Sequence, residues 1–234
     1  MKKALGIAAA AIALTWALPG FADDSETCPR PGAASFLASL TKAAEACRNL
    51  ADKNEAFAQY DLGIIYDQGL GVTQSNKDAM KYYMAAANQG FVYAQDRLGT
   101  IYAKGLLDQP QDYQQSANWY GAAANQGFAD AQYSLGVLFE QGRGVPQNYA
   151  QAIKYYSAAA NQGYPRAQFN LAYMYVNGKG VKQDFVQAYV WLNLAAAVNS
   201  EFADSRDQIA KRLTPEQLGK AQDQALQWKP QQSS

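Results

Sequence analysis

The stretch Ala-Asn-Gln-Gly decides the fold of this 234-residue chain, because it occurs three times at nearly equal intervals. The copies give spacings of 37 and 36 residues and stand at Ala87–Gly90, Ala124–Gly127 and Ala160–Gly163. After each copy comes an Ala-Gln pair, then Leu-Gly or Leu-Ala, and then an aromatic residue. A fixed period of this length is typical of a solenoid, in which each unit buries its apolar face against its neighbours.

Working outward from these copies, the chain aligns on itself as four units. Their expected bounds are 56–92, 93–129, 130–165 and 166–201. The first helix of each unit, helix A, carries Ala, Leu, a large aliphatic residue and an aromatic residue at offsets 0, 4, 7 and 8. These offsets fall on one face of an α-helix. In three units a glycine follows the Leu, at Gly63, Gly99 and Gly136. Since glycine weakens a helix interior, its recurrence predicts that a neighbouring helix backbone approaches closely there.

Each unit is predicted to hold a second helix, helix B. Helix A ends at a glycine suited to a left-handed cap, and three units then read Gly-x-Gly-Val. These glycines follow a helix rather than a strand, so they are interpreted as turn formers and not as a phosphate loop. Helix B starts near Asn76, Tyr113, Asn148 and Asp184, carries paired bulky residues and an alanine run, and ends at Asn-Gln-Gly.

The Ala-Gln-x-x-Leu-Gly-x-x-Tyr-x-x-Gly-x-Gly-Val run and the Tyr-x-Ala-Ala-Ala-Asn-Gln-Gly run resemble Sel1-like repeats, relatives of the tetratricopeptide repeat. The resemblance covers about residues 56–207. It implies an all-α fold in which antiparallel helix pairs stack into a right-handed superhelical solenoid. Members of this family act as adaptors or regulators in protein assemblies, and many are exported from bacteria.

The first 22 residues have the layout of a secretory signal peptide. Lys2 and Lys3 precede an apolar stretch of about 15 residues, and Gly20 and Ala22 are small residues at the −3 and −1 positions of a cleavage site. A membrane anchor is the alternative, but about 20 apolar residues are needed to span a bilayer. We therefore expect a mature chain from Asp23, without membrane insertion after cleavage, in the bacterial periplasm or outside the cell.

The two cysteines, Cys28 and Cys47, both lie near the expected mature N-terminus. In an oxidising compartment they are most simply interpreted as a disulfide that staples the N-terminal lead to the first helix. The alternative is a buried, unbonded Cys47 with Cys28 in a loose tail.

Both ends of the repeat array are predicted to be capped. Residues 23–55 form the N-terminal lead and a capping helix at about Ala33–Leu50, and residues 202–228 form the C-terminal cap. Thr214, Pro215 and Gln217 have the spacing of a capping box at the start of a final helix, Pro215–Trp228. Residues 229–234 are expected to be a frayed tail.

The composition disfavours catalysis. The chain has no histidine and only two cysteines, which excludes histidine-based nucleophile activation and histidine-ligated metal sites. The acidic residues are scattered one or two per repeat, as on solvated helix faces. The expected mature chain holds 18 basic and 20 acidic residues, which does not fit nucleic-acid binding. No catalytic residue, metal or cofactor is therefore expected.

Positions that vary between repeats are the natural place for partner specificity. On helix A these positions lie opposite the core face. The predicted groove is centred on Tyr60, Arg97, Tyr133, Phe169 and Tyr173, because Tyr and Arg are enriched among binding hot spots. The alternative is that these aromatics are half-exposed and pack between adjacent units. Leu106 and Leu107, in the one connection that lacks the second glycine, either pack inward or form an apolar bump for a partner.

The sequence thus favours a non-catalytic scaffold that binds a protein or peptide partner. One alternative is an enzyme, since cysteine-rich relatives have been described as penicillin-binding proteins or β-lactamases. Those relatives carry a disulfide within each repeat, and no Ser-x-x-Lys motif occurs in the repeats of this chain. The other alternative is a secreted factor that engages host proteins.

Overall fold

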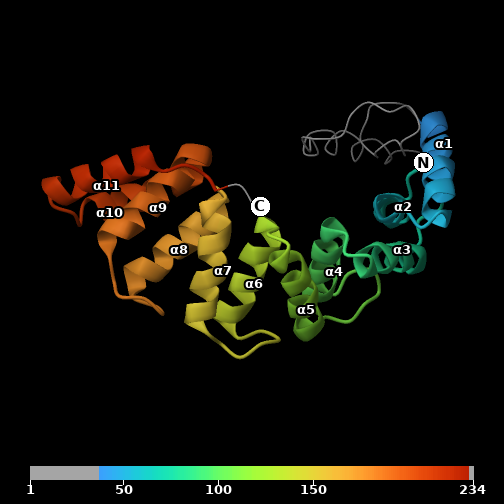
Figure 1. Ribbon diagram of the computed structural model, residues 1–234, viewed down its shortest axis with the longest axis horizontal. Helices are drawn as coiled ribbons and strands as arrows, with labels where there is room; N and C mark the ends of the chain where they lie inside the picture. The colour runs from blue at the N-terminus through green and yellow to red at the C-terminus, as the bar shows by residue number, and fades with distance from the viewer. Residues whose placement is uncertain (1–36, 232–234) are drawn as a thin grey trace, which may run out of the picture. The chain divides into compact units, whose positions relative to one another are not determined.

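A computed structural model describes residues 37–231, and every regular element in that range is helical. The expected all-α class is confirmed. The chain, whose helices are labelled in Figure 1, divides into two compact units, one ending at Ala94 and the other beginning at Gln95. The first unit holds α1 (Leu37–Asp52), α2 (Ala56–Gln68), α3 (Asn76–Asn88) and the start of α4 (Val92–Lys104). The second holds the rest of α4, α5 (Tyr113–Asn125), α6 (Ala129–Gln141), α7 (Tyr149–Asn161), α8 (Pro165–Asn177), α9 (Phe185–Val198), a 3₁₀ turn η1 (Ser200–Phe202), α10 (Ala203–Ala210) and α11 (Pro215–Gln227).

Local signals fix where these helices begin and end. Helix B of each repeat starts after a side chain that accepts a hydrogen bond from the first turn, namely Ser75, Asp112, Asn148 and Asp184. Such N-caps satisfy backbone amides that have no partner within the helix. Helix A ends at glycines with φ between 63° and 67°, as the sequence predicts: Gly69, Gly105, Gly142 and Gly178. Each repeat is therefore a helix pair with short connections.

The recurring glycine inside helix A faces an aromatic ring of helix B. A Cβ atom added at Gly63 would lie 2.5 Å from the ring of Tyr83, and one at Gly136 would lie 2.7 Å from the ring of Tyr156. Gly99 faces Tyr120 in the same way. The predicted close approach is confirmed, but the prediction that a helix backbone makes it is wrong. The ring of an aromatic side chain on helix B fills the space instead.

In the third and fourth repeats, the second glycine of the Gly-x-Gly-Val connection lets the loop pack on helix B of the preceding repeat. A Cβ atom at Gly144 would lie 2.2 Å from the carbonyl group of Tyr113, and one at Gly180 would lie 2.7 Å from Cβ of Tyr149. The residue between the glycines is a cation over the same tyrosine ring: Arg143 over Tyr113 at 5.3 Å and Lys179 over Tyr149 at 5.5 Å. The connections therefore fasten one repeat to the next.

The connection of the second repeat differs, as its sequence predicts. Leu106 donates its backbone N–H to Ile101, and Leu107 and Asp108 both have positive φ, at 53° and 61°. The side chains of Leu106 and Leu107 are half-buried, so they form neither a fully packed core nor an exposed bump. The extra residue is accommodated by two left-handed residues in place of the second glycine.

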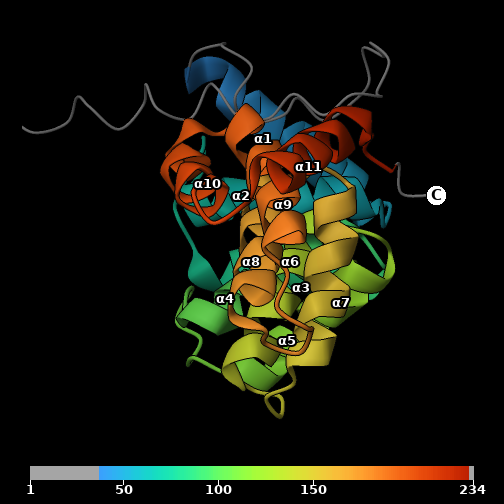
Figure 2. The same ribbon diagram turned by 90° about the vertical axis from the view of Figure 1, so that its left-hand side faces the viewer.

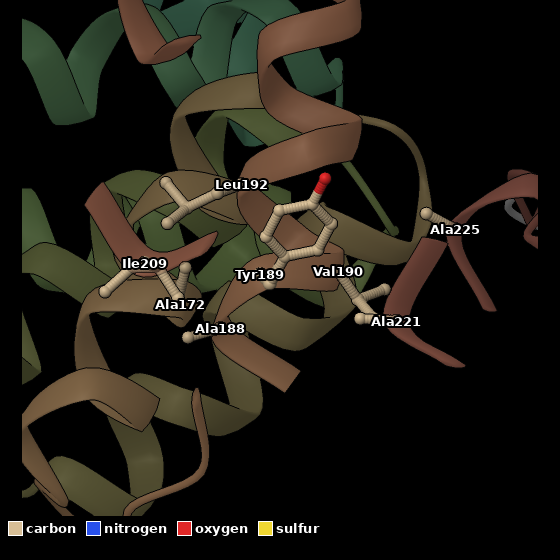
Figure 3. Close-up of a cluster of buried hydrophobic side chains, with 8 residues drawn as sticks. All are labelled: Ala172, Ala188, Tyr189, Val190, Leu192, Ile209, Ala221 and Ala225. Carbon is tan, nitrogen blue, oxygen red and sulfur yellow. The ribbon is translucent and has the colours of Figure 1, made fainter. Parts of the chain in front are cut away.

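The C-terminal cap follows the prediction. Thr214 and Gln217 form the capping box at the start of α11, with Pro215 in the first turn. α10 and α11 both pack against α9, and Figure 2 shows α11 lying across it. Small residues let α11 approach closely, since Ala221 and Ala225 are buried against the fourth repeat. Figure 3 shows Val190 of α9 beside Ala221, while Ala172, Leu192 and Ile209 gather on the other side.

At the other end, α1 runs two residues beyond the expected Leu50. Its buried residues Ala44, Cys47 and Ala51 pack against Ala58, Leu62 and Ile65 of α2. Residues 1–22 and Cys28 lie outside the described residues, so the signal peptide and the Cys28–Cys47 bond stay predictions. Within residues 37–231, no helix combines the length and apolar character needed to cross a membrane.

Candidate partner-binding surface

The predicted groove residue of the first unit, Tyr60, is a packing residue. Only 8% of its surface is exposed. Its ring centroid lies 5.7 Å from that of Tyr83, 5.4 Å from Phe91 and 6.3 Å from Tyr93. The alternative that the sequence left open was a half-exposed aromatic packing between adjacent units; Tyr60 is instead buried, and two of its three ring partners lie in its own repeat.

In the second unit the predicted residues divide into packed and exposed ones. Phe169 stacks on Phe202 at 4.9 Å, which joins α8 to the C-terminal cap. Tyr133 is half-buried, with ring centroids of Tyr156 and Tyr164 at 6.0 and 5.4 Å. Arg97 is also half-buried, whereas Tyr173 is 45% exposed and so offers the largest accessible aromatic surface of the five.

Two acidic residues of the second unit, Asp96 and Asp130, influence each other electrostatically. The Tyr164 hydroxyl donates to Asp130 over 2.6 Å. Burial raises the pKa of Asp96 to about 7; the negative charge of Asp130 adds to the rise, and the positive charge of Arg97 opposes it. Burial, together with the hydrogen bond to Asp130, also raises the pKa of Tyr164 above its ordinary value.

A second cluster of contacts in this unit centres on Glu140. This carboxylate accepts a hydrogen bond of 2.7 Å from the Tyr156 hydroxyl and lies 3.8 Å from Nζ of Lys179. Lys179 in turn lies 4.9 Å above the ring of Tyr173. Burial and Glu140 raise the pKa of Tyr156. A cation held between a carboxylate and an aromatic face is positioned rather than freely mobile.

These contacts link residues of the second unit into one network, which we call the α6–α8 patch. Its two clusters of contacts are joined through the buried Tyr156, whose ring centroid lies 6.0 Å from that of Tyr133 and whose hydroxyl donates to Glu140. The patch combines anionic, cationic and tyrosine groups that suit hydrogen bonding to a peptide. Its members are Asp130, Tyr133, Glu140, Tyr164, Tyr173 and Lys179.

Sequence reasoning missed the acidic members because it treated them as scattered, solvated residues. The structure instead pairs Tyr83 with Asp67 at 3.2 Å and Tyr156 with Glu140 at 2.7 Å. In both repeats the acid stands four residues after the helix-A glycine. That shared spacing was the available signal. Among the described residues, no group of three or more metal-ligating side chains occurs.

Comparison with known proteins gives the same repeat units. The Sel1 repeat family model matches residues 56–91, 92–128, 129–164 and 165–200, within one residue of the bounds expected from the sequence. A Sel1 repeat protein from Oxalobacter formigenes is similar in structure, with a TM-score of 0.67, 27% identity, and coverage of 81% of this chain and 80% of that one.

Two further proteins are similar over smaller parts of their own length. A protective antigen present in uropathogenic Escherichia coli strains, which displays an SLR fold, has a TM-score of 0.53 and 27% identity over 80% of this chain and 48% of that chain. Chitin synthase regulatory factor 2 of Schizosaccharomyces pombe is 37% identical over 62 residues, which are 26% of this chain and 12% of that protein. Four consecutive matches to one repeat model, together with helix pairs of that kind, place the chain in the Sel1 repeat family.

Proposed function

We propose that this protein is a non-catalytic scaffold that holds a protein or peptide partner on the α6–α8 patch. Sel1 repeats generally mediate protein–protein interaction. The observation that carries the choice of surface is Tyr173, a 45% exposed aromatic that is held under Lys179 and linked through it to Glu140. Tyrosines that are positioned in the free protein lose little side-chain entropy on binding.

The proposal includes export to the periplasm or the extracellular space. Its support is the signal-peptide layout of residues 1–22 and the pair of cysteines near the expected cleavage site. The similarity to an antigen of uropathogenic Escherichia coli favours a second candidate, a secreted factor that meets host proteins. Cell fractionation separates the two, since they differ in destination rather than in binding surface.

Photo-crosslinking tests the surface directly. A photoreactive amino acid at Tyr173 should give a crosslinked protein partner in the native host, because this side chain lies on the patch. The matched control is the same amino acid at Asn118, an exposed position on helix α5 of the same unit. Crosslinks of equal yield at both positions, or only at Asn118, would refute the patch.

A labelled penicillin tests the enzymatic alternative. The sequence pattern Ser-x-x-Lys occurs once among the described residues, from Ser39 to Lys42 on α1, outside the repeats. We expect no covalent labelling of the purified protein. Labelling that disappears in the Ser39→Ala variant would contradict the non-catalytic scaffold, while labelling that survives would indicate another nucleophile and contradict it as well.

A further inference from the structure

The end of the chain returns to the third repeat. After α11 the backbone becomes extended, with φ −67° and ψ 140° at Trp228. The backbone N–H of Gln231 donates to the carbonyl oxygen of Asn161, the last residue of α7, over 2.7 Å. In Figure 1 the red end of the chain reaches that end of α7. We call residues Trp228–Gln231 the tail strap.

The tail strap makes apolar contacts beside this hydrogen bond. The rings of Trp228 and Trp191 of α9 meet edge to face, with centroids 6.5 Å apart. A Cβ atom added at Gly163 would lie 3.7 Å from the Trp228 ring and 3.9 Å from Cβ of Pro230, which is ordinary van der Waals contact. The strap therefore lies along the turn that ends the third Ala-Asn-Gln-Gly stretch.

The chemistry of this turn explains what it recognises. The carbonyl of Asn161 is one of the last four of its helix, which have no partner within the helix and therefore need an outside donor. The helix C-terminus also carries partial negative charge, which favours cations, and the strap contains one, Lys229. A backbone N–H, a lysine and a tryptophan with a proline thus match a carbonyl, a helix terminus and a turn whose Gly163 presents no side chain.

The hold of the strap is limited. Lys229, Pro230 and Gln231 are exposed, and only Trp228 is half-buried. One backbone hydrogen bond and one aromatic contact suit reversible binding, while the covalent link to α11 gives the strap a high effective concentration at the turn. A segment of a second chain with the same chemistry has the same contacts to make once the strap leaves.

We propose that the turn Asn161–Gly163 at the end of α7, together with the ring of Trp191 on α9, is a binding site for an extended peptide of the Trp-Lys-Pro-Gln kind, which the tail strap occupies in cis and keeps closed to other chains. This site shares no residue with the α6–α8 patch, although Gly163 directly precedes the patch residue Tyr164 in the sequence. Its occupant is defined by a tryptophan, a basic residue and a proline in sequence, followed by a free backbone N–H.

The test adds a fluorescent peptide with the sequence of residues 226–234 to full-length protein and measures its anisotropy. Trp228→Ala should bind the peptide about tenfold more tightly than wild type, as expected if the strap closes the site about nine-tenths of the time. Binding should shift the NMR signals of the Gly163 amide and the Trp191 indole. A control peptide with alanine in place of tryptophan should not bind.

A second variant keeps the test decisive if Trp228→Ala perturbs the cap. Gln231→Pro removes the backbone donor and leaves the aromatic contact, so it should raise peptide affinity by a smaller factor. Lys229→Pro cannot serve as the control because it changes the strap itself. Gln227→Ala lies on α11 before the strap and should bind the peptide as wild type does. Folded variants that bind the peptide no better than wild type would overturn the proposal. That result would leave the crosslinking expected at Tyr173 unaffected.

Discussion

Repeats 3 and 4 of the second unit have the same backbone plan, but they use different side chains at matching positions. In repeat 3, Gln162 at the end of helix B donates to Gln132 of helix A over 2.8 Å. The first two repeats hold the same pair, Gln89 to Gln59 and Gln126 to Gln95, both at 2.7 Å. In repeat 4, Val198 stands where Gln162 would be, and Oε1 of the buried Gln168 accepts no hydrogen bond among the described residues.

A second set of contacts changes as a whole. Repeat 3 has Gly136 under the ring of Tyr156, whose hydroxyl reaches Glu140. The matching residues of repeat 4 are Ala172, Leu192 and Val176, so the ring, the space for it and the acceptor of its hydroxyl are all replaced. In repeat 4 the ring, its space and its acceptor are exchanged together and the repeat stays packed. The exchange of one member of the glutamine pair, at Val198, instead leaves Oε1 of Gln168 without a partner among the described residues.

The largest expected effect comes from removing the cap that repeat 4 depends on. Ending the chain before Pro215 exposes the face of α9 that α11 covers through Ala221 and Ala225. The loss of this buried surface should cost about 3 kcal/mol or more, concentrated in repeat 4. Hydrogen exchange should show protection lost in α8 and α9 before α6 and α7. A truncated protein that melts like the full chain and stays monomeric would disprove the capping role of α11.

The next largest effect distinguishes a glycine that faces an aromatic ring from a glycine with open space around it. Gly136→Ala places a Cβ atom 2.7 Å from the Tyr156 ring, which should destabilise the unit by about 1–3 kcal/mol. Gly121→Ala, on α5, meets no atom within 4 Å and should stabilise by about 0.5–1 kcal/mol. Urea unfolding measures both. If the two variants shift stability in the same direction, the ring does not occupy the glycine site in solution.

A smaller effect concerns Asp96, at the position held by Tyr133 in repeat 3 and Phe169 in repeat 4. Its pKa rises from an ordinary 3.8 to about 7 in the folded protein. Because the folded state binds this proton more tightly, the stability it contributes is present at acidic pH and is lost as pH rises from about 4 to about 7. The change should be about 1–2 kcal/mol, allowing for partial exposure.

Thermal unfolding at several pH values checks this. Asp96→Asn should melt with a weaker dependence on pH in that window than wild type. The matched control is Asp112→Asn, since Asp112 lies in the same repeat but caps a helix. An unchanged pH profile in Asp96→Asn would show that Asp96 titrates as an ordinary surface acid.

The smallest effect repairs the missing contact of repeat 4. Val198→Gln should restore a donor to Oε1 of Gln168 and stabilise the protein by about 0.5–1.5 kcal/mol. It also replaces a valine that is 70% exposed. Val198→Leu controls for the change in size, because it offers no donor. Equal stability of the two variants would mean that the Gln168 oxygen already has a partner, such as water.

The fold was largely predictable because it depends on features that recur. The period, the left-handed glycines and the capping box at Thr214 are local signals, and each appears where the sequence places it. The contacts of the candidate site were harder to predict. That Tyr60 is buried, or that Asp96 is partly buried beside Asp130, depends on which rings fill the space between helices. Comparison of repeats shows that such positions vary, but it does not show which variable side chains stay accessible.

The central claim is that repeated residues maintain the fold and variable residues of the α6–α8 patch hold the partner. One experiment measures melting temperature and capture of the crosslinked partner for Tyr173→Ala beside Gln162→Ala, which breaks the recurring glutamine pair. We predict that Tyr173→Ala loses the partner and melts like wild type, while Gln162→Ala melts at lower temperature and keeps the partner when assayed below its transition. The reverse pattern, with the partner retained by Tyr173→Ala and lost by folded Gln162→Ala, would contradict the account.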